Sequence, residues 1–157
     1  MRRTVVAVVF NKSGVLSRIT SVLNRRQVNI ESIAVGEIDS ERSRMTFVVK
    51  ADTLDEVEQV IKQLNKQVEV IKVSDITEIP HIERELALIK VYAPAAMRHE
   101  IQAMISPFRA DVVDVGQKNI VIQVSGAHEK VNACIDVLKA YGIKQLSRTG
   151  ITSLTRS

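Results

Sequence analysis

An internal repeat constrains the fold of this chain more than any other feature of its sequence. Two segments carry the same apolar stripe at a constant offset of 74 residues: Val57, Val60, Ile61 and Leu64 in the first, and Val131, Cys134, Ile135 and Leu138 in the second. Because residues three and four apart share one face of a helix, each stripe predicts a helix with one buried side. The 157 residues are therefore interpreted as two small units of about 75 residues each.

The first half predicts the element order β-α-β-β-α-β. Strands are expected where short runs rich in Val and Ile lie between turn residues, at 4–10, 30–38, 45–51 and 68–76. One helix is expected after Gly14, with Leu16 among the apolar residues of its buried face. A second helix is expected after Thr53, because Thr53 and Glu56 have the spacing of a capping box.

The same order is predicted again after a connector at 77–83. The expected strands are 86–92, 111–115, 120–124 and 143–147, and the expected helices are 94–105, with Ile101, Met104 and Ile105 on its inner face, and the helix of the second stripe. The predicted fold class is therefore α+β, with two tandem ferredoxin-like βαββαβ units. Units of this size bury little surface, so we expect contacts with a partner to contribute to their stability.

Composition argues against several classes of function. The net charge is +4, but both signs are mixed along the chain instead of forming a basic face, so no nucleic-acid partner is expected. RNA-recognition modules of this fold carry aromatic residues on the third strand, where this chain offers only Phe47. No apolar run approaches the length of a membrane span or a signal peptide, so we expect no membrane partner and a cytoplasmic location.

Metal and thiol chemistry is not expected either. Cys134 is the single cysteine, and its place in the apolar stripe predicts a core residue. His81, His99 and His128 lie in three separate polar segments, so they are expected to be exposed and uncommitted, and no metal site is predicted.

The junction between the first strand and the first helix is the most informative segment. Asn11, Lys12, Ser13 and Gly14 break the strand, and the N-terminus of a helix follows, where free backbone N–H groups favour an anion such as a carboxylate. Val15 and Leu16 would line an apolar pocket beside it, which suits an aliphatic amino acid. The alternative, in which Asn11 and Gly14 only form the turn, is equally compatible with these residues.

Segments along the whole chain resemble one family, the small regulatory subunits of acetolactate synthase (acetohydroxyacid synthase). The matching segments are Asn11-x-x-Gly14-x-Leu16-x-Arg18-Ile19, Asn29-Ile30-Glu31-Ser32, Ser43-Arg44-Met45-Thr46, His81–Glu85, Phe108-Arg109, Asp111–Val115 and Ser147–Ile151. The resemblance implies an ACT domain at 1–77 that binds the effector and dimerises, a linker at 78–83, and the family's C-terminal domain at 84–157.

The resemblance also implies a function. A subunit of this family has no catalytic activity alone and carries no cofactor. It binds and activates a large catalytic subunit that holds thiamine diphosphate, Mg and FAD, and it confers feedback inhibition by a branched-chain amino acid, most often valine, with leucine and isoleucine as alternatives. By position, Asn11, Gly14, Val15 and Leu16 match the effector loop of one protomer, and Asn29 and Ile30 match the residues contributed by the other.

Physical reasoning agrees with a homodimer. In this topology the strand at 30–38 lies at a sheet edge, and pairing it with a second copy removes an exposed edge. Two-fold pairing would then bring Asn29 of one chain near Asn11 of the other. There the two amides could hold the ammonium and carboxylate of the effector.

Two other functions were compared with this one. An acylphosphatase-like enzyme would use an arginine near the first loop, and Arg18 lies close, but the third strand has no Asn to position an attacking water. A free-standing ACT regulator of another target would share the first half. The second half discriminates, because 81–151 resembles the acetolactate synthase family.

Overall fold

The structure is a computed structural model that describes residues 1–156. It divides into two compact units. Unit 1 comprises Met1–Ile82 together with the described residues from Ile151 onward, and unit 2 comprises Glu83–Gly150.

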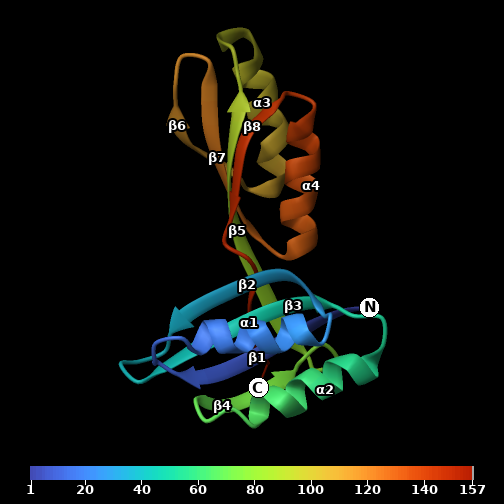
Figure 1. The fold of residues 1–157 in the computed structure, drawn as a ribbon. Coiled ribbons are helices and arrows are strands. Elements are labelled where there is room, and N and C mark those ends of the chain that lie inside the picture. The colour runs from blue at the N-terminus through green and yellow to red at the C-terminus, as the bar shows by residue number, and fades with distance from the viewer. Residues whose placement is uncertain (157) are drawn as a thin grey trace. The chain divides into compact units, whose positions relative to one another are not determined.

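Unit 1 is built on a four-stranded antiparallel sheet (Figure 1). Its elements along the chain are β1 (Arg2–Phe10), α1 (Val15–Arg25), β2 (Asn29–Glu37), β3 (Arg42–Lys50), α2 (Leu54–Asn65) and β4 (Val70–Asp75). The strand order is β2-β3-β1-β4, which leaves β2 at one edge as expected. The predicted cap of α2 is confirmed, because the hydroxyl of Thr53 accepts a hydrogen bond from the backbone N–H of Glu56 at 3.3 Å.

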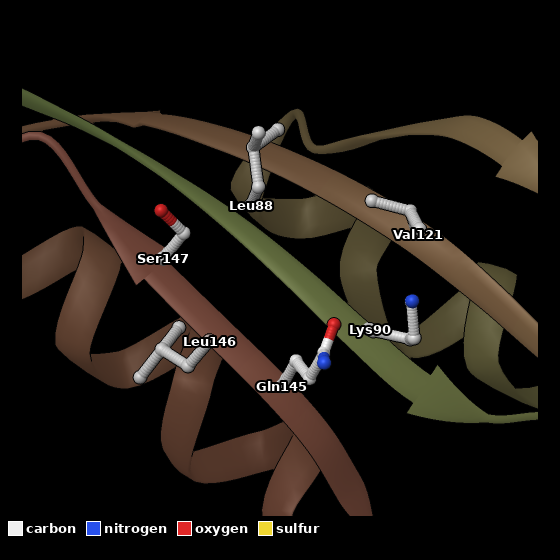
Figure 2. A pocket seen from close by; sticks show the side chains of 6 residues that line it. All are labelled: Leu88, Lys90, Val121, Gln145, Leu146 and Ser147. Atoms are coloured by element: carbon white, nitrogen blue, oxygen red, sulfur yellow. The ribbon is translucent and has the colours of Figure 1, made fainter.

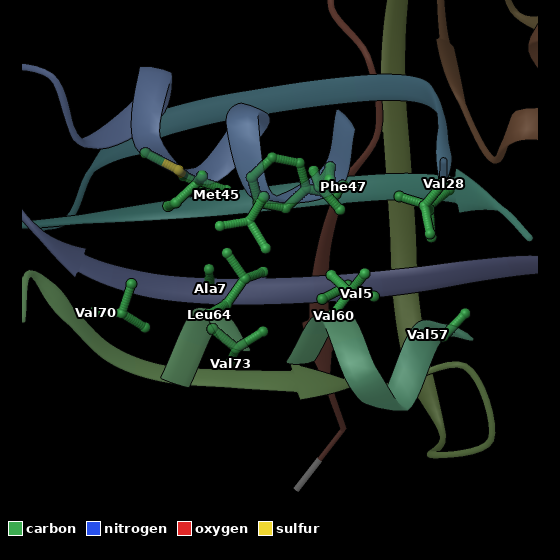
Figure 3. Packing of buried hydrophobic residues seen from close by; sticks show 14 of the residues in the cluster. Val5, Ala7, Val28, Met45, Phe47, Val57, Val60, Leu64, Val70 and Val73 are labelled. Carbon is green, nitrogen blue, oxygen red and sulfur yellow. The ribbon is translucent and has the colours of Figure 1, made fainter. Parts of the chain in front are cut away.

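The core of unit 1 lies between one face of this sheet and the two helices (Figure 3). Register explains its composition: Val5 pairs with Phe47 and Ala7 with Met45, so these four side chains share one face. Burying a Phe or Val side chain stabilises the unit by about 1.5 to 3 kcal/mol. Leu16 does not join them, contrary to prediction, because it lies in the first turn of α1 beside the loop, where its side chain is 43% exposed.

The other face of the sheet is covered by a strand that was not predicted, β9 (Thr152–Thr155). β9 pairs with β5 (His81–Tyr92), and the guanidinium of Arg44 donates two hydrogen bonds, of 3.2 and 2.9 Å, to the backbone oxygen of Ser153. Val48 on this face is fully buried. The residues from Ile151 onward are thus part of unit 1, although all of unit 2 precedes them in sequence.

Unit 2 repeats the architecture of unit 1. Its elements after the start of β5 are the short 3-10 helix η1 (Ala95–Met97), α3 (Arg98–Ile105), the 3-10 helix η2 (Ser106–Phe108), β6 (Asp111–Val115), β7 (Asn119–Gly126), α4 (His128–Lys139) and β8 (Ile143–Arg148). Its sheet order is β6-β7-β5-β8, and its apolar core lies between one sheet face and α3 and α4. The prediction of two βαββαβ units is confirmed.

Several details of unit 2 differ from the prediction. β5 begins at His81 and not at Leu86, because β9 supplies a partner for its first residues. The helix expected over 94–105 starts with a 3-10 turn, and Met104 is 42% exposed while Ile101 and Ile105 are buried.

The structure confirms the prediction for Cys134 and contradicts the prediction for His128. Cys134 is a buried core residue, as predicted, and burial raises the pKa of its thiol. The expectation of an uncommitted His128 is wrong, because its Nδ1 lies 3.5 Å from the carboxylate of Glu85 and its Nε2 lies 2.9 Å from the side chain of Asn132. The same expectation is wrong for His81, whose Nδ1 lies 2.6 Å from the backbone oxygen of Ile79. None of the helices in residues 1–156 is long and apolar enough to cross a bilayer.

Candidate functional site

The loop between β1 and α1 is held in one conformation by Gly14. Gly14 caps α1 with a φ of 82°, in the left-handed region that glycine adopts without steric cost. A Cβ atom there would also lie 3.0 Å from the guanidinium nitrogen Nη1 of Arg18. The loop therefore favours glycine for its conformation, whereas the guanidinium, at the end of a flexible side chain, could move aside.

Asn11 fixes the same loop to the turn between β2 and β3. Its side-chain nitrogen donates to the backbone oxygens of Asp39 at 3.1 Å and Arg42 at 3.3 Å, and its side-chain oxygen accepts a hydrogen bond from the hydroxyl of Ser43. Its backbone N–H donates to the oxygen of Glu41 at 2.7 Å. Asn11 thus positions the loop within the chain.

A solvent-open hollow of about 500 Å³ lies beside this loop. Its apolar walls include Val15 and Leu16 from α1 and Met45 from β3, and the charged residues along it are Lys12 and Glu37. The structure therefore brings together four of the predicted site residues, namely Asn11, Gly14, Val15 and Leu16.

The start of α1 offers an unneutralised positive helix end to this hollow. No side chain caps the helix, and its first turn has no acidic residue. Backbone N–H groups at such a terminus favour an anion by about 0.3 to 1 kcal/mol when exposed and more when buried. A carboxylate is therefore a suitable ligand for this end of the hollow.

Arg18 is engaged elsewhere. Its guanidinium pairs with the carboxylate of Glu69 at 2.7 Å and donates to the backbone oxygen of Ser13 at 3.3 Å. These contacts give it a local role in holding the loop.

Asn29 and Ile30 lie at the opposite end of the sheet of unit 1. Asn29 pairs with Lys50 at the end of β3, whereas Phe10, next to the loop, pairs with Arg42 at the start of β3. Eight residues of strand separate the two ends, which is about 27 Å at the roughly 3.4 Å per residue of an antiparallel strand. Within one chain, Asn29 and Ile30 therefore do not meet the loop.

The residues that line the hollow but were not predicted from sequence include Glu37, Ser43 and Met45. The signal for two of them was present, because Ser43 and Met45 belong to a segment that matched the family. Their place beside the loop depends on the pairing of β1 with β3, which sets Val9 opposite Ser43.

The structure holds no candidate for a metal centre among residues 1–156, where no three His, Cys, Asp or Glu side chains gather closely enough to bind an ion.

Comparison with known proteins places both halves of the chain in one family. Residues 6–72 match the family model described as an AHAS small subunit-like ACT domain, and residues 84–157 match the model described as the small subunit of acetolactate synthase.

Individual relatives agree. The chain is 50% identical over 157 residues to the acetolactate synthase small subunit of Bacillus subtilis, covering 99% of this chain and 91% of that protein. It is 52% identical to the small subunit of Lactococcus lactis, with 99% of each chain covered. The crystal structure of the small subunit from Thermotoga maritima matches with a TM-score of 0.88 and 35% identity over 100% of this chain and 98% of that one. The chain therefore belongs to the family of acetolactate synthase small subunits, and its N-terminal part is the ACT domain of that family.

Proposed function

We propose that this chain is the regulatory subunit of an acetolactate synthase, which binds and activates a thiamine-diphosphate-dependent catalytic subunit and makes it sensitive to a branched-chain amino acid. The chain is similar in sequence to acetolactate synthase small subunits over nearly its whole length, which supports a large subunit as its partner. The observation that carries the effector site is the hollow at the β1–α1 loop, where an uncapped helix terminus adjoins apolar side chains. Residues 1–77 would act as the effector-binding domain, 78–83 as a linker and 84–157 as the C-terminal domain.

The effector site is proposed to be completed by a second copy. β2 is an edge strand, and an antiparallel pairing of two β2 strands centred on Ile33 would set Asn29 of one chain opposite Glu37 of the other. Because Glu37 lines the hollow, this pairing would carry Asn29 and Ile30 of the second copy to the loop of the first. Asn29 and Ile30, which lie about 27 Å from the loop of their own chain, would thus lie beside the loop of the other chain.

Each part of an aliphatic amino acid has a suitable partner in such a site. The carboxylate would accept hydrogen bonds from the first turn of α1, and the ammonium would be held by Glu37 and the amide of Asn29. The aliphatic side chain would lie against Leu16 and the partner's Ile30. One methylene is worth only about 1 to 3 kcal/mol in such a pocket, so valine, leucine and isoleucine would all enter and differ mainly in affinity.

Feedback requires that the effector bind one state of the complex more tightly than another, since a ligand with equal affinity for both shifts nothing. A ligand that bridges two chains meets this condition when the bridge is compatible with only one arrangement on the catalytic subunit. Valine is therefore proposed to act by clamping the β2–β2 interface.

Reconstitution tests the proposal. The purified chain is mixed with the large subunit, and acetolactate formation from pyruvate is measured with and without millimolar valine, leucine or isoleucine. Activation together with inhibition by one of them is expected. Activation without inhibition by any of the three would overturn the effector site, and the absence of activation would indicate a free-standing amino-acid-binding regulator of another target.

A further inference from the structure

The two edges of the unit 1 sheet differ in how open they are. β2 forms one edge, where Val35 is 50% exposed and a Cβ atom at Gly36 would meet no heavy atom within 4 Å beyond its chain neighbours. β4 forms the other edge, and α2 contacts this strand. An edge strand presents unpaired backbone N–H and C=O groups, with which a strand of another chain can pair. β2 is open to such pairing, whereas pairing at β4 depends on what covers that strand.

The side chain of Asn65, the last residue of α2, covers the middle of the β4 edge. Its oxygen accepts a hydrogen bond from the backbone N–H of Val73 at 3.1 Å, and its nitrogen donates to the backbone oxygen of Val73 at 3.5 Å. Alternate residues of an antiparallel strand point their backbone groups to opposite sides. The N–H of Ile76 donates to the backbone oxygen of Thr4 on β1, so Val73, three residues earlier, points away from β1. The amide of Asn65 therefore takes the place of a neighbouring strand.

Unit 2 carries a different residue at this place, although the two units share their architecture. The offset of 74 residues that relates the two helical stripes sets Lys139 of α4 in the position of Asn65. The Lys139 ammonium pairs with Asp136 of its own helix at 3.0 Å. Beside β8, the strand that corresponds to β4, Figure 2 shows an open hollow of about 580 Å³, and the residues that line it belong to β5, β7 and β8. An amide at the strand edge is thus a feature of unit 1 and not a requirement of the fold.

We propose that the Asn65 amide closes the β4 edge to strand addition, so that a second copy of this chain can extend the unit 1 sheet only at β2. A sheet with one open edge pairs with one other copy about a two-fold axis, and the assembly ends there. A sheet with two open edges would join copies alternately through β2 and β4 without a limit. Asn65 thereby keeps the assembly finite. The proposal concerns the β4 edge and does not rest on the proposed function.

Two substitutions of Asn65 test the proposal, because they remove the same hydrogen bonds and differ in charge. The mass of the full chain is followed by sedimentation velocity from micromolar to submillimolar concentration. Asn65→Ala uncovers the N–H and C=O of Val73, and its mass is expected to rise at least about twofold over the parent, since one pairing at β4 joins two parent particles. Asn65→Lys uncovers the same groups, but pairing at β4 would bring two ammonium groups together. This variant is expected to keep the mass of the parent.

Asn24→Ala is the matched control, because Asn24 is an exposed amide in the last turn of α1, the other helix of unit 1. It is expected to keep the mass of the parent. Amide exchange supplies a second readout: the N–H of Val73 should exchange faster in dilute Asn65→Ala and slow again as the mass rises with concentration. The proposal is overturned if Asn65→Ala has the mass of the parent at every concentration. It is also overturned if Asn65→Lys gains mass equally, since that result would show a loss of folding instead of an opened edge.

Discussion

Arg148 donates a hydrogen bond to the carboxylate of Glu85 and so joins β8 to β5 inside unit 2. The Glu85 side chain is only 3% exposed, and His128 at the start of α4 lies 3.5 Å from the same carboxylate oxygen. This ion pair brings together two segments that matched the family separately in sequence, 81–85 and 147–151. The resemblance of both segments to the family therefore has a structural explanation, because they contact each other inside unit 2.

Removal of the arginine is expected to destabilise unit 2 strongly. Arg148→Ala leaves a buried carboxylate without its partner, which costs about 3 kcal/mol. Urea unfolding followed by circular dichroism measures the loss. Lys139→Ala is the matched control, because its pair with Asp136 is about two-thirds exposed on both sides and is worth less than about 1 kcal/mol. Equal effects of the two variants would contradict the assignment of a structural role to the Glu85–Arg148 pair.

Unit 1 is expected to lose stability in acid, because the carboxylate of Asp75 stabilises it only while ionised. Burial opposes ionisation of its carboxyl, but hydrogen bonds from Thr77 and from the Arg3 guanidinium at 2.7 Å outweigh burial, and the pKa of Asp75 is lowered. A pKa that is lower in the folded chain contributes stability above the unfolded value of about 3.9, and this contribution is lost as pH falls through the folded pKa.

Asp75→Asn tests this pH dependence. The free energy of unfolding of the variant should lie below that of the parent at pH 7, and the gap should shrink as the pH is lowered from 5 to 3. Urea titrations at four pH values measure the gap. A gap that stays constant over this range would show that Asp75 does not contribute through its charge.

Ile151 is expected to stabilise unit 1, although unit 2 separates it from the rest of unit 1 in sequence. Its side chain is 1% exposed, and truncation of a buried Ile costs about 2 to 5 kcal/mol. Ile151→Ala should therefore accelerate amide exchange in β1 and β3 more than in β7. Leu154→Ala is the control, because that side chain is 62% exposed. Faster exchange confined to unit 2 would contradict the placement of this segment.

The effector loop yields a functional prediction. Gly14→Asp places a Cβ and a negative charge where the carboxylate of the effector is proposed to bind, and Asn29→Ala removes the amide contributed by the partner. Both variants should retain activation of the catalytic subunit and lose sensitivity to valine. Reconstituted activity at increasing valine concentration measures this. Unchanged inhibition of either variant would contradict the effector assignment at that residue.

Most of the fold could be predicted because local patterns and tertiary packing agree. The stripe at Val57 and Leu64 is buried as periodicity required, and Thr53 caps its helix. β9 was missed because it has four residues and gains its partners from β5 and Arg44, far away in sequence. The early start of β5 was missed for the same reason, since its charged residues suggest a connector until Glu85 meets Arg148.

Only those residues of the candidate site that lie close together in the sequence could be predicted. Gly14 and Leu16 follow from the strand-to-helix junction, and both lie beside the hollow. Glu37 enters from a strand whose position depends on sheet order, which no local pattern encodes. Asn29 lies at the far end of the sheet, so its proposed role depends on a second chain, and the family resemblance supplied it.

The return of residues 151–156 to unit 1 has a consequence during synthesis. A ribosome makes this segment after every residue of unit 2, so β3 is translated about a hundred residues, and β1 about 140 residues, before the strand that covers their outer face. Unit 1 keeps Val48 and its neighbours open to solvent until β9 leaves the exit tunnel, and β8, which completes the sheet of unit 2, emerges only a few residues earlier. Nascent chains of this protein should therefore recruit chaperones through the N-terminal sheet until residues 151–156 have left the ribosome.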